Sequence, residues 1–397
     1  MRLSDRALML NPSPTMSIDA KAKAMKASGI SVVGFGAGEP DFDTPDHIKH
    51  AAVAAIWSGM TKYTPVAGTN ELKEAICSKF KVDQGLEYQP SQIVASAGAK
   101  HSLFNAIQVL VHAGDEVILP APYWVSYLEQ IKLAGAEAKI VETQEINGFK
   151  ITPAELESVI NQRTRLLILN TPGNPTGAVY SEAELRALGE VIVRHDITII
   201  SDEVYEKILY DGLRHVSIAS ISPDLKERTV VINAVSKAYA MTGWRIGYAA
   251  APSSVASAMA SLQSHSTSNP TSIAQAASVA ALCGDQEPIN RMVEEYTQRR
   301  NYMLERLLSI PGITCNRPGG AFYLFPNVKS YFKKTFKGSV INCATDLATV
   351  LLEETQVAVV PGVAFGNDSC LRLSYAVSMD NIREGMDRIT TLMERIY

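Results

Sequence analysis

The amino-acid sequence predicts an α/β protein with two parts: a large domain whose mainly parallel β-sheet is flanked by helices, and a smaller α+β domain. Three observations support this fold class. Short β-rich runs alternate with helical patterns through the middle of the chain, some of these helices have clear start signals, and the pattern changes toward the C-terminus. Alternation of this kind is typical of parallel strands joined by helices that cover both faces of a sheet.

Six segments of the middle region have the composition of buried strands. They are residues 93–97, 116–119, 165–170, 197–201, 229–233 and 245–250. Two predicted helices, one between two of these segments and one before the first of them, have recognisable N-termini. Ser181 and Glu184 have the spacing of a capping box, and Thr44 and Pro45 suit the cap and first turn of a helix that stops at Gly59.

The C-terminal part of the chain has a different pattern. A long helical stretch, "YTQRRNYMLERLLSIPGI", is followed by a turn and strand in "GGAFYLFPNV" and then by a further helix and strand. This order predicts the smaller α+β domain. We therefore expect a large domain over residues 46–284, and a small domain made of residues 285–397 together with residues 1–45, which have no sheet of their own.

The composition is that of an ordinary globular protein, with 397 residues, 46% hydrophobic, 20% charged and a net charge of -4. This charge gives no reason to expect nucleic acid or an anionic membrane as a partner. No uncharged apolar run approaches the ~18 residues of a membrane helix, and the N-terminus lacks the apolar run of a signal peptide. The five cysteines are widely spaced without a C-x-x-C pair, which predicts free thiols in a cytoplasmic protein with no metal site.

Small and polar residues follow four of the predicted strands. In chain order they are Gly98 with Ala99, Asn174 in "TPGNPTG", Asp202 with Tyr205, and Ser236 with Lys237. Each alone is more often structural, as a turn residue or a helix N-terminal acid. Open α/β sheets bind ligands at the carboxyl ends of their strands, so together these residues predict a site with a phosphate cradle, an amide, a carboxylate, a phenol and an amine.

Lys237 and Arg245 are the only lysine or arginine residues between Arg228 and Pro252. Desolvating a cation without a partner is costly, so both side chains are expected to face a ligand. A lysine amine kept near neutral by low polarity and a nearby cation is a nucleophile toward aldehydes. With a phosphate at a helix N-terminus and an acid beside a pyridine nitrogen, this set describes a site for pyridoxal 5'-phosphate.

Six motifs distributed along the chain resemble those of fold-type-I pyridoxal-phosphate aminotransferases. They are "GAGEPDFDTP", "KYTPVAG", "NTPGNPTG", "SDEVYE", "SKAYAMTGWRIGY" and "LRLSY". Through "NPSPTMSI" and "APYWVSY" the chain is most similar to the bacterial branch of aspartate and aspartate/prephenate aminotransferases. The resemblance implies ping-pong transfer of an amino group between aspartate or glutamate and 2-oxo acids, with prephenate as a further substrate.

The resemblance assigns roles around the cofactor ring. Lys237 would bind the aldehyde and move the proton during transfer, and Asp202 would pair with the pyridine nitrogen. Tyr205 and Asn174 would hydrogen-bond the ring oxygen, and Trp124 would stack on the ring. Asn174 and Trp124 would also border the substrate.

The cofactor phosphate would be bound by a second group of residues. Arg245, Ser236 and the backbone of Gly98 and Ala99 would contact it within one subunit. Tyr63 would reach the phosphate of the neighbouring subunit, which implies a homodimer with shared active sites.

The substrate would be held by residues from several motifs. Arg372 would bind the α-carboxylate, and Gly38 would leave room for the substrate. A dicarboxylic substrate needs a second anion site, for which no arginine can be identified from a motif and Lys100 is the better candidate. Ser13 and Thr15 match an N-terminal segment that closes over the substrate.

Two positions depart from the family pattern. Ala234 stands where many relatives have a phosphate-binding serine, and Ala99 replaces the second glycine of a Gly-Gly-Lys sequence. The alternatives are an aminotransferase for aromatic or neutral amino acids, a lyase on the same fold, and a pyridoxal-phosphate-binding regulator. His47 and His50 have helical spacing but no third ligand, so we interpret them as a solvated helix face.

Overall fold

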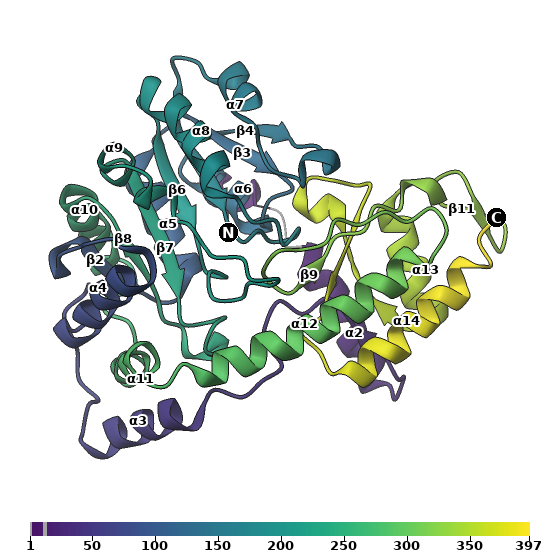
Figure 1. The fold of residues 1–397 in the computed structure, drawn as a ribbon, viewed down its shortest axis with the longest axis horizontal. Coiled ribbons are helices and arrows are strands. Elements are labelled where there is room, and N and C mark those ends of the chain that lie inside the picture. The colour runs from purple at the N-terminus through teal and green to yellow at the C-terminus, as the bar shows by residue number, and fades with distance from the viewer. Residues whose placement is uncertain (1, 11–13) are drawn as a thin grey trace.

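A seven-stranded, mainly parallel β-sheet forms the centre of the molecule (Figure 1). The structure is a computed structural model of the 397-residue chain, and it describes residues 2–10 and 14–397. Across the sheet the strands are β2 (Ile93–Ser96), β8 (Gly247–Ala250), β7 (Thr229–Ala234), β6 (Thr198–Asp202), β5 (Thr164–Asn170), β3 (Glu116–Ala121) and β4 (Glu137–Glu142). Within this sheet β8 runs antiparallel to β2 and β7, and the other neighbouring pairs are parallel.

Helices cover both faces of this sheet. The helices of this part of the chain are α3 (Asp46–Trp57), α4 (Asn70–Gln84), α5 (Ala99–Leu110), α6 (Val125–Leu133), α7 (Pro153–Val159), α8 (Glu182–Arg194), α9 (Pro223–Lys226), α10 (Ser253–Ser264) and α11 (Ser272–Cys283). In β5, Leu166 and Ile168 pack with side chains of α5, α6 and α10, whereas Leu167 and Leu169 pack with those of α7 and α8. This alternation explains why residues 166–169 of the strand are all apolar, since both of its faces are buried there.

The C-terminal part of the chain forms a smaller group of helices and short strands. They are α12 (Glu287–Leu308), β9 (Tyr323–Leu324), β10 (Thr335–Phe336), β11 (Ser339–Val340), α13 (Ala344–Thr355), β12 (Val357–Ala358), β13 (Val360–Pro361), β14 (Leu371–Ser374) and α14 (Met379–Met393). In it β9, β14 and β13 form an antiparallel sheet. Figure 1 shows α12 running from beside α11 to this group.

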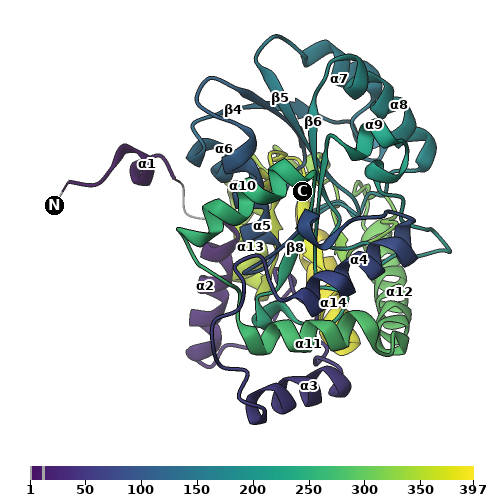
Figure 2. The same cartoon turned by 90° about the vertical axis from the view of Figure 1, so that its left-hand side faces the viewer.

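The N-terminal residues lie beside this smaller group. Strand β1 (Val33–Gly34) pairs in parallel with β12 of the C-terminal part, and α2 (Pro14–Ala27) contacts β12 and β13. Figure 2 shows α1 (Asp5–Leu8) standing apart from the rest of the molecule, and no residue of α1 is buried. The division of the chain into residues 46–284 and residues 1–45 with 285–397 stays a prediction.

The predicted α/β fold class is confirmed, with differences at the ends of elements. The last predicted strand begins at Gly247 rather than at Arg245, whose φ of 60° is left-handed. Thr44 does not cap α3, because its hydroxyl donates to the carbonyl oxygen of Ala240 and the cap position is Pro45. The capping box of Ser181 and its partner at the third helical position is present in α8.

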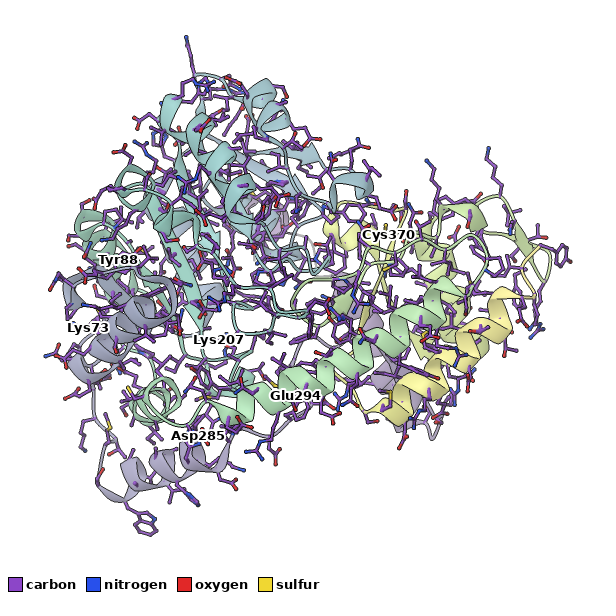
Figure 3. All side chains as sticks on the ribbon, in the orientation of Figure 1. Lys73, Tyr88, Lys207, Asp285, Glu294 and Cys370 are labelled. Atoms are coloured by element: carbon purple, nitrogen blue, oxygen red, sulfur yellow. The ribbon has the colours of Figure 1, made fainter. Side chains whose placement is uncertain are left out.

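The edge strand β4 was not predicted, because most of its side chains are exposed and its pattern is not that of a buried strand. The five cysteines are free, as predicted, and Figure 3 marks the position of Cys370, which is buried among the C-terminal elements. Among the helices that the structure describes, none is long and apolar enough to cross a membrane.

Candidate active site

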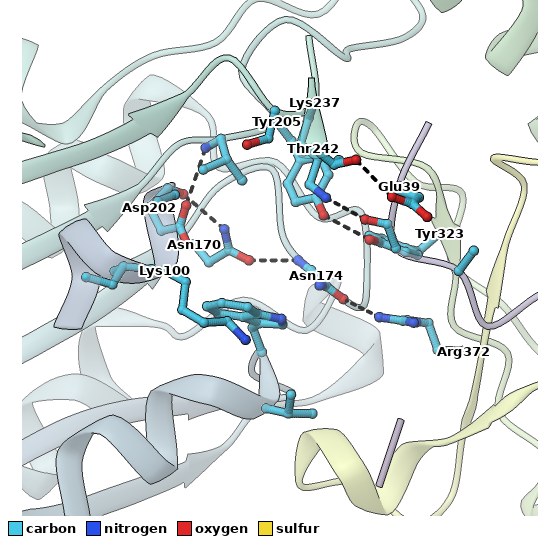
Figure 4. Close-up of a pocket in the computed structure, with 18 of the residues that line it drawn as sticks. Glu39, Lys100, Asn170, Asn174, Asp202, Tyr205, Lys237, Thr242, Tyr323 and Arg372 are labelled. Carbon is cyan, nitrogen blue, oxygen red and sulfur yellow. Dashed lines mark hydrogen bonds between the residues drawn. The ribbon is translucent and has the colours of Figure 1, made fainter. Parts of the chain in front are cut away.

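The carboxyl ends of β5, β6 and β7 border a cavity of about 440 Å³, and residues of the small antiparallel sheet line its other side. The cavity brings together most of the residues that the sequence predicted. Those lining it are Gly38, Ala99, Lys100, Trp124, Asn174, Asp202, Tyr205, Ser236, Lys237, Arg245 and Arg372 (Figure 4).

Two predicted residues in the described part of the chain do not line this cavity. Gly98 lies just behind its wall, against Arg245. Tyr63 is 91% exposed and lies outside the cavity. Ser13 and the side chain of Thr15 lie outside the described residues.

Lys237 follows β7, and its Nζ donates a hydrogen bond to the carbonyl oxygen of Gly38. Burial lowers the pKa of Lys237 to about 8; Glu39 opposes this shift, and Arg372 and Arg245 add to it. A sizeable fraction of the amine is therefore neutral near physiological pH, as a nucleophile or general base requires.

Asp202 ends β6 and is 4% exposed. Burial raises the pKa of its carboxyl to about 6, although the hydroxyl of Tyr127 donates to Oδ2 at 2.6 Å and opposes the shift. A buried carboxyl with a raised pKa lacks a full positive partner. It is therefore suited to pair with a cation that enters the cavity, such as a protonated ring nitrogen.

Arg372, in β14, donates hydrogen bonds to two residues that line the cavity. Its Nη1 donates to Oδ1 of Asn174 at 3.1 Å, and its Nη2 donates to the carbonyl oxygen of Gly36 at 2.7 Å. The backbone N–H of Asn174 in turn donates to Oδ1 of Asn170 at 2.7 Å. The buried Nε of Arg372 has no hydrogen-bond partner among the described residues, which makes it a candidate donor to an anion.

The N-terminus of α5 and Arg245 form the positive end of the site. Gly98 precedes α5 with φ +88°, and a side-chain carbon at this position would overlap the Arg245 guanidinium. The guanidinium is held by the carbonyl oxygens of Thr242 at 2.9 Å and Ala97 at 3.2 Å. Free helix N–H groups beside an arginine fit a phosphate, while the amine and the carboxyl of the cavity fit the aldehyde and ring nitrogen of pyridoxal phosphate.

The structure adds residues that the sequence reasoning missed. Tyr127, Asn170, Glu39 and Tyr323 all line the cavity, and the first two hold predicted site residues. Tyr127 lies three residues after Trp124 at the start of α6, so helical spacing could have indicated it. Tyr323 had no local signal, because it reaches the cavity only through the pairing of β9 with β14.

Whole-chain comparisons identify the family. Residues 30–389 match the family model of class I and II aminotransferases, and the chain belongs to this family. It is 52% identical to the aspartate aminotransferase of Geobacillus stearothermophilus over 99% of both chains. It is 48% identical to the aspartate/prephenate aminotransferase of Nitrosomonas europaea, over 99% of this chain and all of that one. The crystal structure of the Rhizobium meliloti aspartate aminotransferase superimposes with a TM-score of 0.97, 44% identity and full coverage of both chains.

Proposed function

We propose that this aminotransferase uses pyridoxal phosphate to transfer the amino group of L-aspartate or L-glutamate to 2-oxo acids. The observation that best supports this function is the shared cavity of Lys237, Asp202 and Arg372: an amine, a buried carboxyl and a guanidinium with a free donor. The names of the relatives at 52% and 48% identity give the substrate class.

The cofactor would be held by the residues around the cavity. Asp202 would bind the pyridine nitrogen, Tyr205 and Asn174 the ring oxygen, and Trp124 the ring face. Ser236, Arg245 and the backbone N–H of Ala99 would bind the phosphate. The N–H of Gly98 donates to the carbonyl oxygen of Ser96 at 2.7 Å, so Gly98 would contribute by leaving room for Arg245. When bound, pyridoxal phosphate acts as an electron sink for the negative charge that develops at the substrate Cα.

The chain's own groups then bind the substrate and move its proton. Arg372 presents Nε and the adjacent guanidinium edge to the α-carboxylate, and Asn174 and Gly36 fix the plane of this fork. Lys237, with its amine near neutral, would move the proton between the substrate Cα and the aldehyde carbon of the cofactor, first as general base and then as general acid. Gly38 keeps the adjacent wall free of a side chain.

Lys100 is the proposed contact for the distal carboxylate. Its Nζ lies 4.9 Å from the centre of the Trp124 ring, at the wall of the cavity. A lysine is a mobile point charge, so this site should accept dicarboxylates of different reach, including prephenate. The contacts expected from Ser13 and Thr15 stay a prediction.

We also propose a homodimer in which Tyr63 completes the phosphate site of the neighbouring subunit. An exposed fraction of 91% is unusual for a tyrosine and suits a side chain covered by a partner. The cytoplasmic location expected from the sequence stays a prediction.

A half-reaction tests the function. The purified holoenzyme is mixed with L-aspartate or L-glutamate alone, and the absorbance of the cofactor is followed. We expect a complete spectral change without ammonia release, and its reversal on addition of 2-oxoglutarate. Continuous release of ammonia would favour a lyase, and a response only to aromatic or neutral amino acids would contradict the substrate class.

A further inference from the structure

Two buried phenols meet across the cavity. The hydroxyl oxygens of Tyr205 and Tyr323 lie 2.9 Å apart, with exposed fractions of 3% and 0%, and both residues line the cavity (Figure 4). Tyr205 follows β6 of the large sheet, whereas Tyr323 belongs to β9 of the small one. The contact therefore joins two parts of the molecule that are separated by more than a hundred residues.

A pair of phenols at this distance shares one hydrogen bond, so one hydroxyl donates and the other accepts. In the proposed function Tyr205 donates its proton to the cofactor ring oxygen. Its own oxygen then needs a donor, and Tyr323 is the hydroxyl within reach. Burial raises the pKa of both phenols, and that of Tyr205 lies well above its usual value. For Tyr323 the charge of Arg372 is the first effect that opposes this rise. Tyr323 is therefore the more acidic phenol and the better donor of the pair.

Tyr323 also contacts the substrate end of the cavity. The Cζ of Arg372 lies 4.6 Å from the centre of the Tyr323 ring and 4.9 Å from that of Phe365, so the guanidinium contacts both aromatic rings. A side-chain carbon on Gly38 would approach the Tyr323 hydroxyl to 3.2 Å. One side chain thus contacts the proposed cofactor-oxygen residue, the proposed carboxylate residue and the substrate wall.

We propose that Tyr323 is a positioning residue for amino transfer: its hydroxyl donates to Tyr205 and directs the Tyr205 proton toward the cofactor oxygen, while its ring orients Arg372. This inference rests on the proposed roles of Tyr205 and Arg372. The two parts of the Tyr323 side chain thus have separate functions: the hydroxyl acts on the cofactor through Tyr205, and the ring acts on substrate binding through Arg372.

Two substitutions in the holoenzyme separate these functions. Tyr323→Phe keeps the ring and removes the hydroxyl, so we expect kcat to fall about 3- to 10-fold, the scale of one hydrogen bond, with KM for aspartate within about twofold. The pH midpoint of the cofactor absorbance should rise, because Tyr205 donates less well to the ring oxygen. Tyr323→Leu should in addition raise KM for aspartate by about fivefold through loss of the cation–π contact.

A double-mutant cycle and a matched control complete the experiment. Tyr205→Phe should shift the absorbance midpoint further than Tyr323→Phe, and the double variant should shift it no further than Tyr205→Phe alone. Tyr375→Phe is the control, because Tyr375 is a buried tyrosine that donates to the carbonyl oxygen of Ala321 and does not line the cavity. It should leave the midpoint and KM unchanged.

The outcomes distinguish a failure of the proposed role of Tyr323 from a failure of the proposed function. If Tyr205→Phe moves the midpoint and Tyr323→Phe does not, the positioning role of Tyr323 is wrong while the proposed function stands. Additive shifts in the double variant would also overturn that role. If aspartate fails to change the spectrum of the unmodified holoenzyme, the proposed function has failed, and the role of Tyr323 fails with it.

Discussion

The hydroxyl of Tyr127 donates a 2.6 Å hydrogen bond to Oδ2 of Asp202, and both side chains are buried in the wall of the cavity. This neutral donor does not compensate the burial of the carboxylate, whose pKa is raised to about 6. The protein without cofactor therefore holds a carboxylate that destabilises it at neutral pH. The pyridine nitrogen of a bound cofactor would supply the missing positive charge.

Asp202→Asn should consequently stabilise the cofactor-free protein while abolishing turnover. The folded protein binds the Asp202 proton more tightly than the unfolded chain does, so protonation stabilises the folded state. This stabilisation is complete below the unfolded pKa of 3.8 and is lost as pH rises through about 6. At pH 7.5 we expect the variant to gain about 1–3 kcal/mol in unfolding free energy, and the gain should vanish below pH 4. Urea unfolding at the two pH values measures the difference.

Asp211→Asn is the matched control with the opposite sign. Arg300 and Arg317 lower the pKa of this carboxyl, so its charge is stabilising and the amide should weaken the protein at pH 7.5. A loss of stability in Asp202→Asn as well would contradict the interpretation of Asp202 as an uncompensated charge.

The reactivity of Lys237 should depend on pH. Only the neutral amine attacks an aldehyde, and burial has lowered the pKa of Lys237 to about 8. The rate at which cofactor-free protein fixes pyridoxal phosphate covalently should therefore rise between pH 7 and 9 and level off above the midpoint. Borohydride trapping of timed samples gives the rate.

Lys237→Ala should bind the cofactor without fixing it and should have no turnover. Borohydride-fixed cofactor in this variant would assign the covalent role to another lysine. A trapping rate that is flat from pH 7 to 9.5 would show that the amine is not near neutral.

The glycine at position 98 should be required for the phosphate site. With φ +88° and ψ 161° it has a backbone conformation that is essentially limited to glycine, and a side-chain carbon would displace Arg245. Gly98→Ala should raise the Kd of pyridoxal phosphate at least about tenfold, the scale of a lost charge-assisted hydrogen bond. Equilibrium dialysis measures this value.

Gly243→Ala provides the comparison within the loop that positions Arg245. A carbon added to Gly243 meets nothing within 4 Å. This variant should bind the cofactor like the unmodified protein, and equal weakening in both variants would remove the specific role of Gly98.

Much of the site could be predicted because its residues lie at the ends of neighbouring parallel strands. Asn174, Asp202 and Lys237 lie at or just after the carboxyl ends of β5, β6 and β7, so the rule that open α/β sheets bind ligands at this edge was enough to group them. The prediction of Tyr205 and Tyr323 as a pair was not possible. Their contact depends on how the small sheet packs against the large one, and no local pattern encodes that distance.

The same limit applies to the conformation of loops. The left-handed φ of Arg245 ends a 3₁₀ turn and shortens the predicted strand, although arginine has no preference for this region. Hydrogen bonds to the carbonyl oxygens of Thr242 and Ala97 hold the side chain in place. Tertiary contacts, rather than local propensity, fix this residue.

The proposed homodimer with shared active sites predicts complementation between two impaired variants. A mixed dimer of Lys237→Ala and Tyr63→Phe chains contains one site with both native residues, so random exchange should restore up to about a quarter of full activity. Activity of the mixture after subunit exchange is compared with the mean of the two separate variants. Lys237→Ala mixed with Asp202→Asn is the control, because both residues belong to the same subunit's site and no native site can form.

Mixtures that never exceed the mean of their parents would place Tyr63 outside the phosphate site. Gain in the control mixture as well would show that Lys237 and Asp202 serve different sites.

Lys100 should determine the preference for dicarboxylic substrates. Its side chain lies at the wall of the cavity and is only partly covered. This partial burial and, second, the charge of Arg245 lower the pKa of the Lys100 amine. An anion bound there would therefore meet a partly desolvated cation. Lys100→Ala should reduce kcat/KM for aspartate by about 10- to 100-fold and for alanine by less than about threefold. Because the ammonium form is required, the preference of the unmodified enzyme for aspartate should also decline as pH rises through the lowered pKa of Lys100. Lys139→Ala, on the exposed edge strand β4, is the control and should change neither value. An equal loss for aspartate and alanine would assign Lys100 to the cofactor instead, since both substrates depend on the same cofactor.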